Sequence, residues 1–348
     1  MCNSESENRL PSTQNRGSQS QYNTDSYNQS QGNHNRYPTR QASCRSCCLP
    51  DPSQANQELS TGIKPEYGIG GVAASAVNFF ITRHCNMRCR FCFAHFRDRQ
   101  ELEWPQVERL LHLLAEAGCR KITFVGGEPL CSPWLTKAIT QAKRLNMTTG
   151  VVTNGALVTP AWVEGMAPAL DWLGLSIDSV DPGTNRRIGR TVEGTPLPWV
   201  HYESLGKAVH RNGVRLKINT VVCAWNWRQD LSEHIPTLLP DRWKVFQALP
   251  IVGENDHQGN EFVVSDDQFA DFRSRHRDCA NTVFETNEAM RESYLMVSPD
   301  GRFFDNSTGK HRFSRCILAH GIDAATSDIL FDSARFRQRG GVYDWKRR

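Results

Sequence analysis

From Val72 onward, short apolar runs alternate with segments of helical periodicity, and this alternation limits the fold more than any other feature of the sequence. Six of the runs have the length and the β-branched or aromatic content of strands, and they span residues 77–82, 121–125, 149–153, 172–177, 216–222 and 243–249. Five segments have helical spacing of their apolar residues, at 104–118, 134–145, near 160–166, near 200–212 and near 231–239. Because strands that alternate with helices form parallel β/α units, the pattern predicts an α/β fold, either a partial (β/α)6 barrel or an open doubly wound sheet.

The first 60 residues differ from the rest in composition. They are rich in Ser, Asn, Gln and Arg and nearly lack aliphatic side chains, so they cannot bury enough apolar surface to offset the entropy of ordering. We therefore expect a disordered tail over 1–70, a barrel core over 71–252 and a mixed C-terminal extension over 253–348. The tail contains Cys44, Cys47 and Cys48, which lack the partner pair of a structural zinc site and which we interpret as incidental thiols.

Composition excludes several classes of protein. No window is long and apolar enough for a transmembrane helix, and the N-terminus lacks the pattern of a secretory signal. Twelve cysteines without an export signal indicate reduced thiols or metal ligands, and hence a cytoplasmic protein. The net charge of +4 is too small to suggest a nucleic-acid polymer as partner, although it leaves room for a local anion site.

Three cysteines follow the first predicted strand in the stretch HCNMRCRFCF, residues 84–93. In a β/α barrel the reactive groups gather at the carboxyl ends of the strands, which is where Cys85, Cys89 and Cys92 would lie. Structural zinc takes four ligands, and no close fourth is visible in the sequence. A [4Fe–4S] cluster needs one ligand for each iron, so three cysteines leave one iron open to a small molecule. The pattern favours a cluster with a vacant corner.

The turn Gly126-Gly127-Glu128-Pro129 follows the second predicted strand. Two glycines allow the backbone to approach a ligand closely. The carboxylate of Glu128 suits an ammonium group. In isolation the sequence Gly-Gly-Glu-Pro would also fit an ordinary turn without a ligand. Here, however, the turn and the cysteines are expected at the same end of the barrel.

The fifth and sixth predicted strands place polar side chains on one face. Side chains alternate along a strand, so Lys217 shares a face with Asn219, and Arg242 shares a face with Lys244. In a barrel the apolar residues would pack against the helices and these four would point inward. Cations in a barrel interior need an anion, and three cations with an amide fit a polyphosphate. Internal ion pairs with acids such as Asp178 or Glu254 are the alternative, and the sequence leaves it open.

The cysteine motif, with Phe91 before its last cysteine, resembles that of the radical S-adenosylmethionine (SAM) superfamily. A more specific resemblance is to the viperin family, nearest to its prokaryotic branch, and runs from about residue 76 to the end. The strings that carry it are NFFITRHCNMRCRFCF (78–93), FVGGEP (124–129), LSIDS (175–179), IGR (188–190), LKIN (216–219), RWKVFQ (242–247), VGEN (252–255), ESYL (292–295) and RGGVYDW (339–345).

The resemblance implies a partial radical SAM barrel that binds a [4Fe–4S] cluster and SAM. Viperins cleave SAM to a 5′-deoxyadenosyl radical, which takes the 4′ hydrogen of a ribonucleoside triphosphate (CTP, UTP or GTP). The product is a 3′-deoxy-3′,4′-didehydro nucleotide that terminates viral RNA chains, an antiviral activity of the lyase type. An electron donor such as flavodoxin or ferredoxin is implied, and we expect a monomer.

The resemblance also assigns residues to roles. Those implied in SAM binding are Phe91, Gly126, Gly127, Glu128, Asn154 and Ser176, and those implied in triphosphate binding are Arg190, Lys217, Asn219, Arg242, Lys244 and Lys310. Tyr294 resembles a tyrosine proposed to quench the substrate radical. The C-terminal extension would close the nucleotide site, and its segment 340–345 would help to read the base. Two departures are Val125, where animal viperins carry serine, and the weakly basic stretch around Lys310.

Two other functions remain open. One is a different radical SAM enzyme that acts on a phosphorylated small molecule. Such enzymes often carry further cluster cysteines, but only Cys279 and Cys316 lie beyond Cys223 here. The other is a binding module with a purely structural cluster, in which the GGEP turn and the inward cations would have no purpose.

Overall fold

The computed structural model describes residues 75–256 and 261–345. The predicted disordered tail, with Cys44, Cys47 and Cys48, lies outside the described residues. Among the described residues, no helix is both long and apolar enough to cross a membrane.

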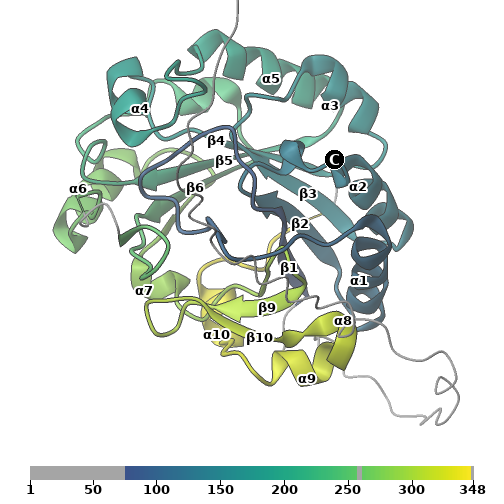
Figure 1. Cartoon of the computed structure of the whole chain (residues 1–348). Coiled ribbons are helices and arrows are strands. Elements are labelled where there is room, and N and C mark those ends of the chain that lie inside the picture. Colours follow the sequence, from purple (N-terminus) through teal and green to yellow (C-terminus); the bar gives the residue numbers. More distant parts are fainter. Residues whose placement is uncertain (1–74, 257–260, 346–348) are drawn as a thin grey trace, which may run out of the picture. The chain divides into compact units, whose positions relative to one another are not determined.

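One ten-stranded sheet forms the centre of the fold, in the order β10-β9-β8-β1-β2-β3-β4-β5-β6-β7. All six predicted strands are confirmed, and they lie side by side in parallel. They are β1 (Ala76–Thr82), β2 (Lys121–Gly126), β3 (Thr148–Thr153), β4 (Trp172–Ser176), β5 (Arg215–Val222) and β6 (Arg242–Gln247). The sheet curves around an interior, with helices on its outer side (Figure 1). The α/β partial barrel is therefore confirmed.

The outer helices are α1 (Trp104–Glu116), α2 (Leu135–Arg144), α3 (Pro160–Met166), α4 (Pro182–Ile188) and α5 (Trp199–Arg211). Helix α1 shows why they form where they do. Its start is fixed by a reciprocal cap between Glu103 and Gln106 with a proline in the first turn, and its apolar stripe is fully buried against the sheet.

Two segments differ from the sequence prediction. The helix expected near 231–239 is wrong, because only a short 3-10 turn, η3 (Ile235–Leu238), forms there. Pro236 and Pro240 limit it, since each lacks the N–H that a longer helix would need. Helix α4 was not predicted, because it buries only Asn185 and Ile188 and has no apolar periodicity.

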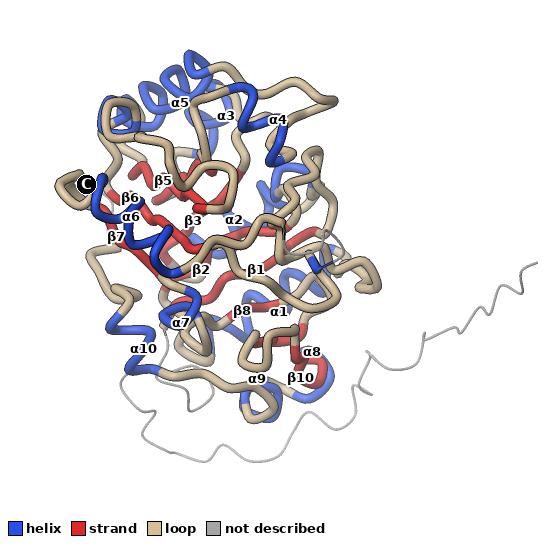
Figure 2. The backbone as a smooth tube through the Cα atoms, turned by 90° about the vertical axis from the view of Figure 1, so that its left-hand side faces the viewer, coloured by secondary structure: helices blue, strands red, loops and turns tan. Residues whose placement is uncertain are grey.

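Residues beyond 253 extend the same sheet at both edges. Strand β7 (Thr282–Glu285) pairs with β6, whereas β8 (Met296–Val297) pairs with β1 and continues into antiparallel β9 (Arg302–Asp305) and β10 (Arg312–Cys316). The helical pieces of this region are α6 (Asp266–His276), α7 (Asn287–Met290), α8 (Ile317–His320), α9 (Ile322–Thr326) and α10 (Ser333–Gln338). Figure 2 shows the strands across the middle, with α3, α4 and α5 towards one side and α8, α9 and α10 towards the other.

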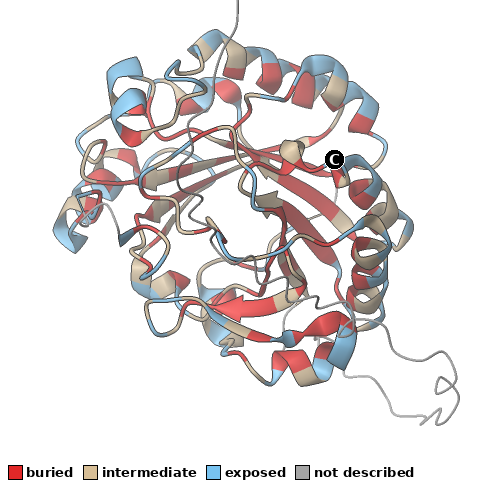
Figure 3. Cartoon of the chain, in the orientation of Figure 1, coloured by how far each residue is buried: buried red, intermediate tan, exposed pale blue. Residues whose placement is uncertain are grey.

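The main core lies between the sheet and its outer helices. Leu216, Ile218, Trp243 and Val245 point into it from β5 and β6, and all are at most 1% exposed. Figure 3 shows the same pattern as buried strands and helix faces that are exposed only on their outer side. Because side chains alternate along a strand, this outward packing turns the polar residues of β5 and β6 towards the barrel interior.

We predict that Leu110→Ala in α1 lowers the free energy of unfolding by about 2–5 kcal/mol, because the side chain is fully buried and its removal leaves a cavity. Denaturant unfolding measures the effect. The neighbouring Arg109→Ala is the control, since Arg109 is exposed and its loss should change stability by only about 0.5 kcal/mol. Equal midpoints for the two variants would contradict the assignment of this face to the core.

Candidate active site

A cavity of about 870 Å³ opens inside the barrel at the carboxyl ends of β1–β6. It brings together most of the residues that the sequence singled out. Those that line it are Cys85, Cys89, Phe91, Cys92, Gly126, Gly127, Asn154, Ser176, Arg190, Lys217, Asn219, Lys244 and Tyr294. Glu128 and Arg242 lie behind the wall, and Lys310 is exposed and does not line the cavity.

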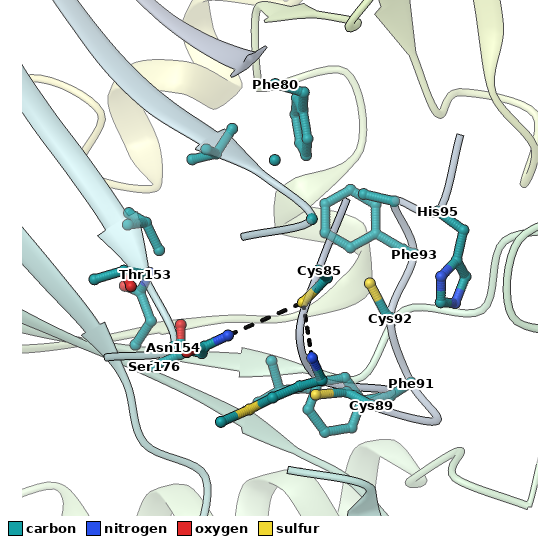
Figure 4. Close-up of a pocket in the computed structure, with 18 of the residues that line it drawn as sticks. Phe80, Cys85, Cys89, Phe91, Cys92, Phe93, His95, Thr153, Asn154 and Ser176 are labelled. Carbon is teal, nitrogen blue, oxygen red and sulfur yellow. Dashed lines mark hydrogen bonds between the residues drawn. The ribbon is translucent and has the colours of Figure 1, made fainter. Parts of the chain in front are cut away.

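The three motif cysteines lie on one loop and face the ends of β3 and β4 (Figure 4). The Cys92 N–H donates to the Cys89 carbonyl (3.1 Å), which makes the loop turn tightly, and the Met87 N–H points at the Cys85 sulfur (3.4 Å). Burial raises the pKa of the Cys89 thiol to about 12 and that of Cys92 to about 11. These thiols therefore stay protonated at neutral pH unless a metal binds them.

The spacing of the thiols fits a cluster better than a single ion. Over residues 75–256 and 261–345, no three His, Cys, Asp or Glu side chains converge as ligands of one metal ion. A [4Fe–4S] cluster instead takes one thiolate at each of three separate irons. Cys85, Cys89 and Cys92 around one cavity suit that arrangement.

The cysteine loop is held against α4 by a close backbone contact. The Arg88 and Arg90 N–H groups donate to the carbonyls of Gly189 (3.3 Å) and Ile188 (2.8 Å). Gly189 has a positive φ of 84°, and a Cβ there would lie 2.2 Å from the Arg88 oxygen. Only glycine allows this approach, so Gly189 fixes the position of the loop.

Gly126 and Gly127 serve the same purpose on the other side of the loop. A Cβ at Gly126 would lie 2.5 Å from the Thr82 oxygen, and one at Gly127 would lie 2.4 Å from the His84 oxygen. The Gly127 N–H donates to Thr82 (2.8 Å), and the Glu128 N–H donates to His84 (2.7 Å). The glycines thus fasten the end of β2 to the start of the cysteine loop, a contact that sequence reasoning did not foresee.

Glu128 is fully buried, and its carboxylate accepts hydrogen bonds from three donors of the chain. They are the Leu130 N–H (3.2 Å), the Thr153 hydroxyl (2.7 Å) and the Asn154 N–H (2.8 Å). Burial raises the pKa of Glu128, and these bonds oppose that shift. The carboxylate therefore joins the ends of β2 and β3 and sets the direction of Asn154, whose amide nitrogen donates to Asn86 (2.7 Å).

A fourth cysteine lies beside the cavity, although none was expected. Cys131 ends the short turn η2 (Pro129–Cys131) that follows Glu128, and it lines the same cavity as the motif cysteines. Burial raises the pKa of its thiol, and the backbone of Asn86 opposes this shift. Its distance from the other cysteines along the chain hid it from the sequence analysis.

Of the two acids that the sequence suggested as ion-pair partners, one pairs with a cation of the cavity and the other binds backbone N–H groups. Asp178 pairs with Arg190, whose Nε donates to it at 2.7 Å, and Glu254 accepts from the backbone N–H groups of His95 and Phe96. Lys244 pairs with Glu285, a residue of β7 that lies outside the predicted barrel strands. The ion-pair alternative therefore holds for Lys244 and Arg190.

Lys217 has no ion-pair partner within 4.0 Å in the described part of the chain. Burial, with Arg242 and Arg339 nearby, lowers its pKa to about 8. Beside it, the Asn219 side-chain oxygen is buried and has no hydrogen-bond partner among the described residues. Arg242 donates to the Gly340 carbonyl (2.7 Å) from the far side of the wall. The interior thus has a local excess of positive charge.

The segment 340–345 lies at the amino ends of the strands, opposite the cysteines. Tyr343 bonds to Lys121 of β2, the Trp345 carbonyl accepts from Trp172 of β4 (3.0 Å), and Asp344 pairs with Arg215 of β5 (2.9 Å). None of residues 340–345 lines the cavity. The aromatic rings surround the buried Lys121, whose pKa burial lowers; sequence reasoning missed this cation because it begins a strand that otherwise reads as apolar.

Comparison with known proteins agrees with this geometry. Residues 79–222, from β1 to the end of β5, match the model of the radical SAM superfamily. An S-adenosylmethionine-dependent nucleotide dehydratase of Flammeovirga pacifica is 39% identical over 278 residues, which are 78% of this chain and 96% of that protein. The chain belongs to this family, the viperins. A family member from Lacinutrix mariniflava is 44% identical over 78% of this chain, and this chain spans only 58% of that longer protein. The zebrafish (Danio rerio) member named RSAD2 is 38% identical over 78% of this chain and 79% of the zebrafish protein.

Solved structures show the same fold at low identity. The structure titled anSMEcpe with bound AdoMet superposes with a TM-score of 0.52 at 14% identity, over 76% of this chain and 81% of the other. Streptococcus suis SuiB bound to S-adenosylmethionine gives 0.51 at 18% identity, over 66% of this chain and 59% of that one. Family members use a [4Fe–4S] cluster and SAM, and the donor set of this cavity fits both.

We predict that Gly189→Ala reduces the iron bound per chain to less than half of the wild-type value, because the added Cβ would displace the cysteine loop. Gly194→Ala is the matched control, since Gly194 also has a positive φ (80°) but no atom within 4 Å of the added Cβ. Both variants carry the backbone strain of about 1–2 kcal/mol. The iron content of the folded protein distinguishes the two variants. Equal iron content in Gly189→Ala and Gly194→Ala would disprove the role of the contact between Gly189 and Arg88.

We predict that binding of inorganic tripolyphosphate weakens as the pH rises through 8. Lys217 is charged below its lowered pKa of about 8 and neutral above it, and a bound polyanion favours the charged form. Binding near pH 8.5 should therefore take up a proton, which calorimetry in buffers of different ionisation enthalpy measures. Lys217→Gln should abolish this uptake, and an unchanged uptake would exclude Lys217 as the titrating group.

Proposed function

We propose that this chain dehydrates a ribonucleoside triphosphate (CTP, UTP or GTP) to its 3′-deoxy-3′,4′-didehydro analogue, an antiviral terminator of RNA chains. The observation that supports it most is the composition of a single cavity. Three thiols of the loop after β1 line it, and the wall formed by β5 and β6 carries Lys217, Asn219 and Lys244. The printed names of the relatives, nucleotide dehydratases that depend on SAM, agree with a polyphosphate at that wall.

In this proposal Cys85, Cys89 and Cys92 hold the [4Fe–4S] cluster. The cluster and SAM together supply a carbon-centred radical that can abstract hydrogen from an unactivated C–H bond. Gly126, Gly127, Asn154, Ser176 and Phe91 line the space beside the cysteines and bind SAM. Glu128 acts from behind this wall, where it already accepts three hydrogen bonds and retains about one further acceptor site.

The phosphate groups lie along β5 and β6. Lys217 and Lys244 supply charge, and the free oxygen of Asn219 accepts from a substrate hydroxyl or from a water. Arg190 and Arg242 contribute to the potential while they are held by Asp178 and Gly340. The exposure of Lys310 places it outside the cavity as it stands, so its contact with phosphate requires movement of the loop around it.

Tyr294 is placed to deliver a hydrogen atom or proton to the substrate. It lines the cavity, its hydroxyl accepts from Lys244 (2.7 Å), and the same hydroxyl donates to Glu285. A substrate with its phosphates on Lys244 would present its sugar near this hydroxyl. Partners in this proposal are a small electron donor such as flavodoxin or ferredoxin, and the enzyme acts as a cytoplasmic monomer.

The decisive experiment offers each ribonucleoside triphosphate in turn to the anaerobically reconstituted full chain with SAM and dithionite. We expect 5′-deoxyadenosine and a nucleotide that is 18 mass units lighter than one of the substrates, because one water is lost. Cys92→Ala should abolish both products, whereas Cys279→Ala, which changes a thiol outside the cavity, should not.

Each alternative function predicts a different result. Formation of 5′-deoxyadenosine only with a non-nucleotide phosphate would identify another radical SAM reaction. Absence of 5′-deoxyadenosine under all conditions, with a fully loaded cluster, would favour a structural cluster in a binding module.

A further inference from the structure

One buried carboxylate lies among the inward cations. Glu285 ends β7 and is 0% exposed, and it is in direct contact with Lys244 and with the hydroxyl of Tyr294. Arg339 approaches the same carboxylate at 3.6 Å. Lys244 and Tyr294 line the cavity, whereas Glu285 and Arg339 lie behind them. Glu285 can therefore act on the cavity only through its contacts with Lys244 and Tyr294.

The network around Glu285 is fixed on all sides. The Arg339 guanidinium donates twice to the Ser293 carbonyl (2.7 and 3.0 Å) and lies over the Tyr294 ring at 3.5 Å from its centroid. Lys244 in turn donates to the Tyr294 hydroxyl at 2.7 Å. Tyr294 and Lys244 are therefore joined both directly and through the Glu285 carboxylate.

The charges near this carboxylate do not balance. The groups that face it or its partners are Lys217 of β5, Arg242 and Lys244 of β6, Tyr294, Arg339 and, more distantly, Lys121 of β2. Lys244 and Arg339 lower the pKa of Glu285 even though burial alone would raise it, so the carboxylate is ionised. Burial lowers the pKa of Lys244, and Glu285 opposes this shift most strongly.

We propose that Glu285 is the resident counter-ion of the polyphosphate site, which keeps Lys244 charged and in place until an incoming phosphate takes over the lysine. This inference rests on the proposed polyphosphate substrate. In this structure the ammonium group of Lys244 contacts one carboxylate, that of Glu285, and one hydroxyl, that of Tyr294. When phosphate binds on the cavity side, the Tyr294 hydroxyl still donates to one oxygen of Glu285, and the Arg339 guanidinium lies 3.6 Å from the other, so the exchange leaves a positive charge beside the buried carboxylate.

This role differs from that of a structural ion pair in one measurable respect. With Glu285 present, Lys244 is already protonated when phosphate arrives, and binding at pH 7 needs no proton there. In Glu285→Gln the buried lysine loses its anion and becomes neutral, so phosphate binding must restore the proton. The variant should therefore take up as much as one extra proton for each tripolyphosphate that binds. Its Kd for tripolyphosphate should rise by up to tenfold for each unit by which the pH increases.

The test is calorimetric titration of the cluster-loaded full chain with inorganic tripolyphosphate at pH 7, without reductant, in buffers of different ionisation enthalpy. We expect little proton uptake by the wild type and clear uptake by Glu285→Gln. Asp300→Asn is the control, because Asp300 lies between β8 and β9 and its ion-pair partners are Arg99 and Arg302, outside the cavity. Equal uptake by the wild type and Glu285→Gln would overturn the proposal.

A double variant shows which group takes up the proton. Lys244→Gln combined with Glu285→Gln removes both charges, and its uptake should return to the wild-type level; persistent extra uptake would overturn the proposal. The double variant should also bind tripolyphosphate several-fold more tightly than Lys244→Gln alone, in which the carboxylate charge faces the phosphate. This comparison decides the matter even if Glu285→Gln does not fold, and equal affinities would count against the proposal. Because no turnover is measured, a failure of nucleotide dehydration would be seen separately.

Discussion

The parallel pairing of β1 to β6 is the constraint on which the site depends. It places the carboxyl ends of six strands at one edge, so a loop after β1, a turn after β2 and polar residues on β3 to β6 meet, although Cys85 and Lys244 are 159 positions apart in the sequence. The close contacts at Gly126, Gly127 and Gly189 then fix the cysteine loop against its two neighbours. Without these glycines the thiols would have no defined position relative to the strands.

The second determinant is the charge inside the barrel. Four cations lie on the strands: Lys121, Lys217, Arg242 and Lys244. Arg339 adds a fifth from the end of α10. The buried carboxylate that contacts Lys244 is Glu285. Buried cations at this density destabilise an empty cavity and are favourable once a polyanion arrives. In the proposed function, the negative charge of a bound polyphosphate would offset this excess of positive charge.

Local patterns explain how much the sequence could predict. The six barrel strands and the apolar faces of α1 and α2 were predictable because alternation and helical periodicity depend on near neighbours in the chain. The same logic failed at α4, which is polar and short, and near 231–239, where two prolines outweighed the apolar spacing. The inward direction of Lys217 and Asn219 also followed from alternation, since their neighbours Leu216 and Ile218 are fully buried on the other face.

The sequence by itself determined the family, the barrel strands and the group of side chains at their ends, because motif spacing and side-chain period are properties of contiguous residues. Only the tertiary structure decided which charges meet. Glu285 reaches Lys244 because β7 adds to the edge of the sheet beside β6, and Arg339 approaches Glu285 from the end of α10. Cys131 reaches the cavity from the end of η2. Likewise, segment 340–345 contacts the amino ends of the strands and not the cavity. These contacts depend on how segments that are distant in the sequence pack together, and no local sequence pattern contains that information.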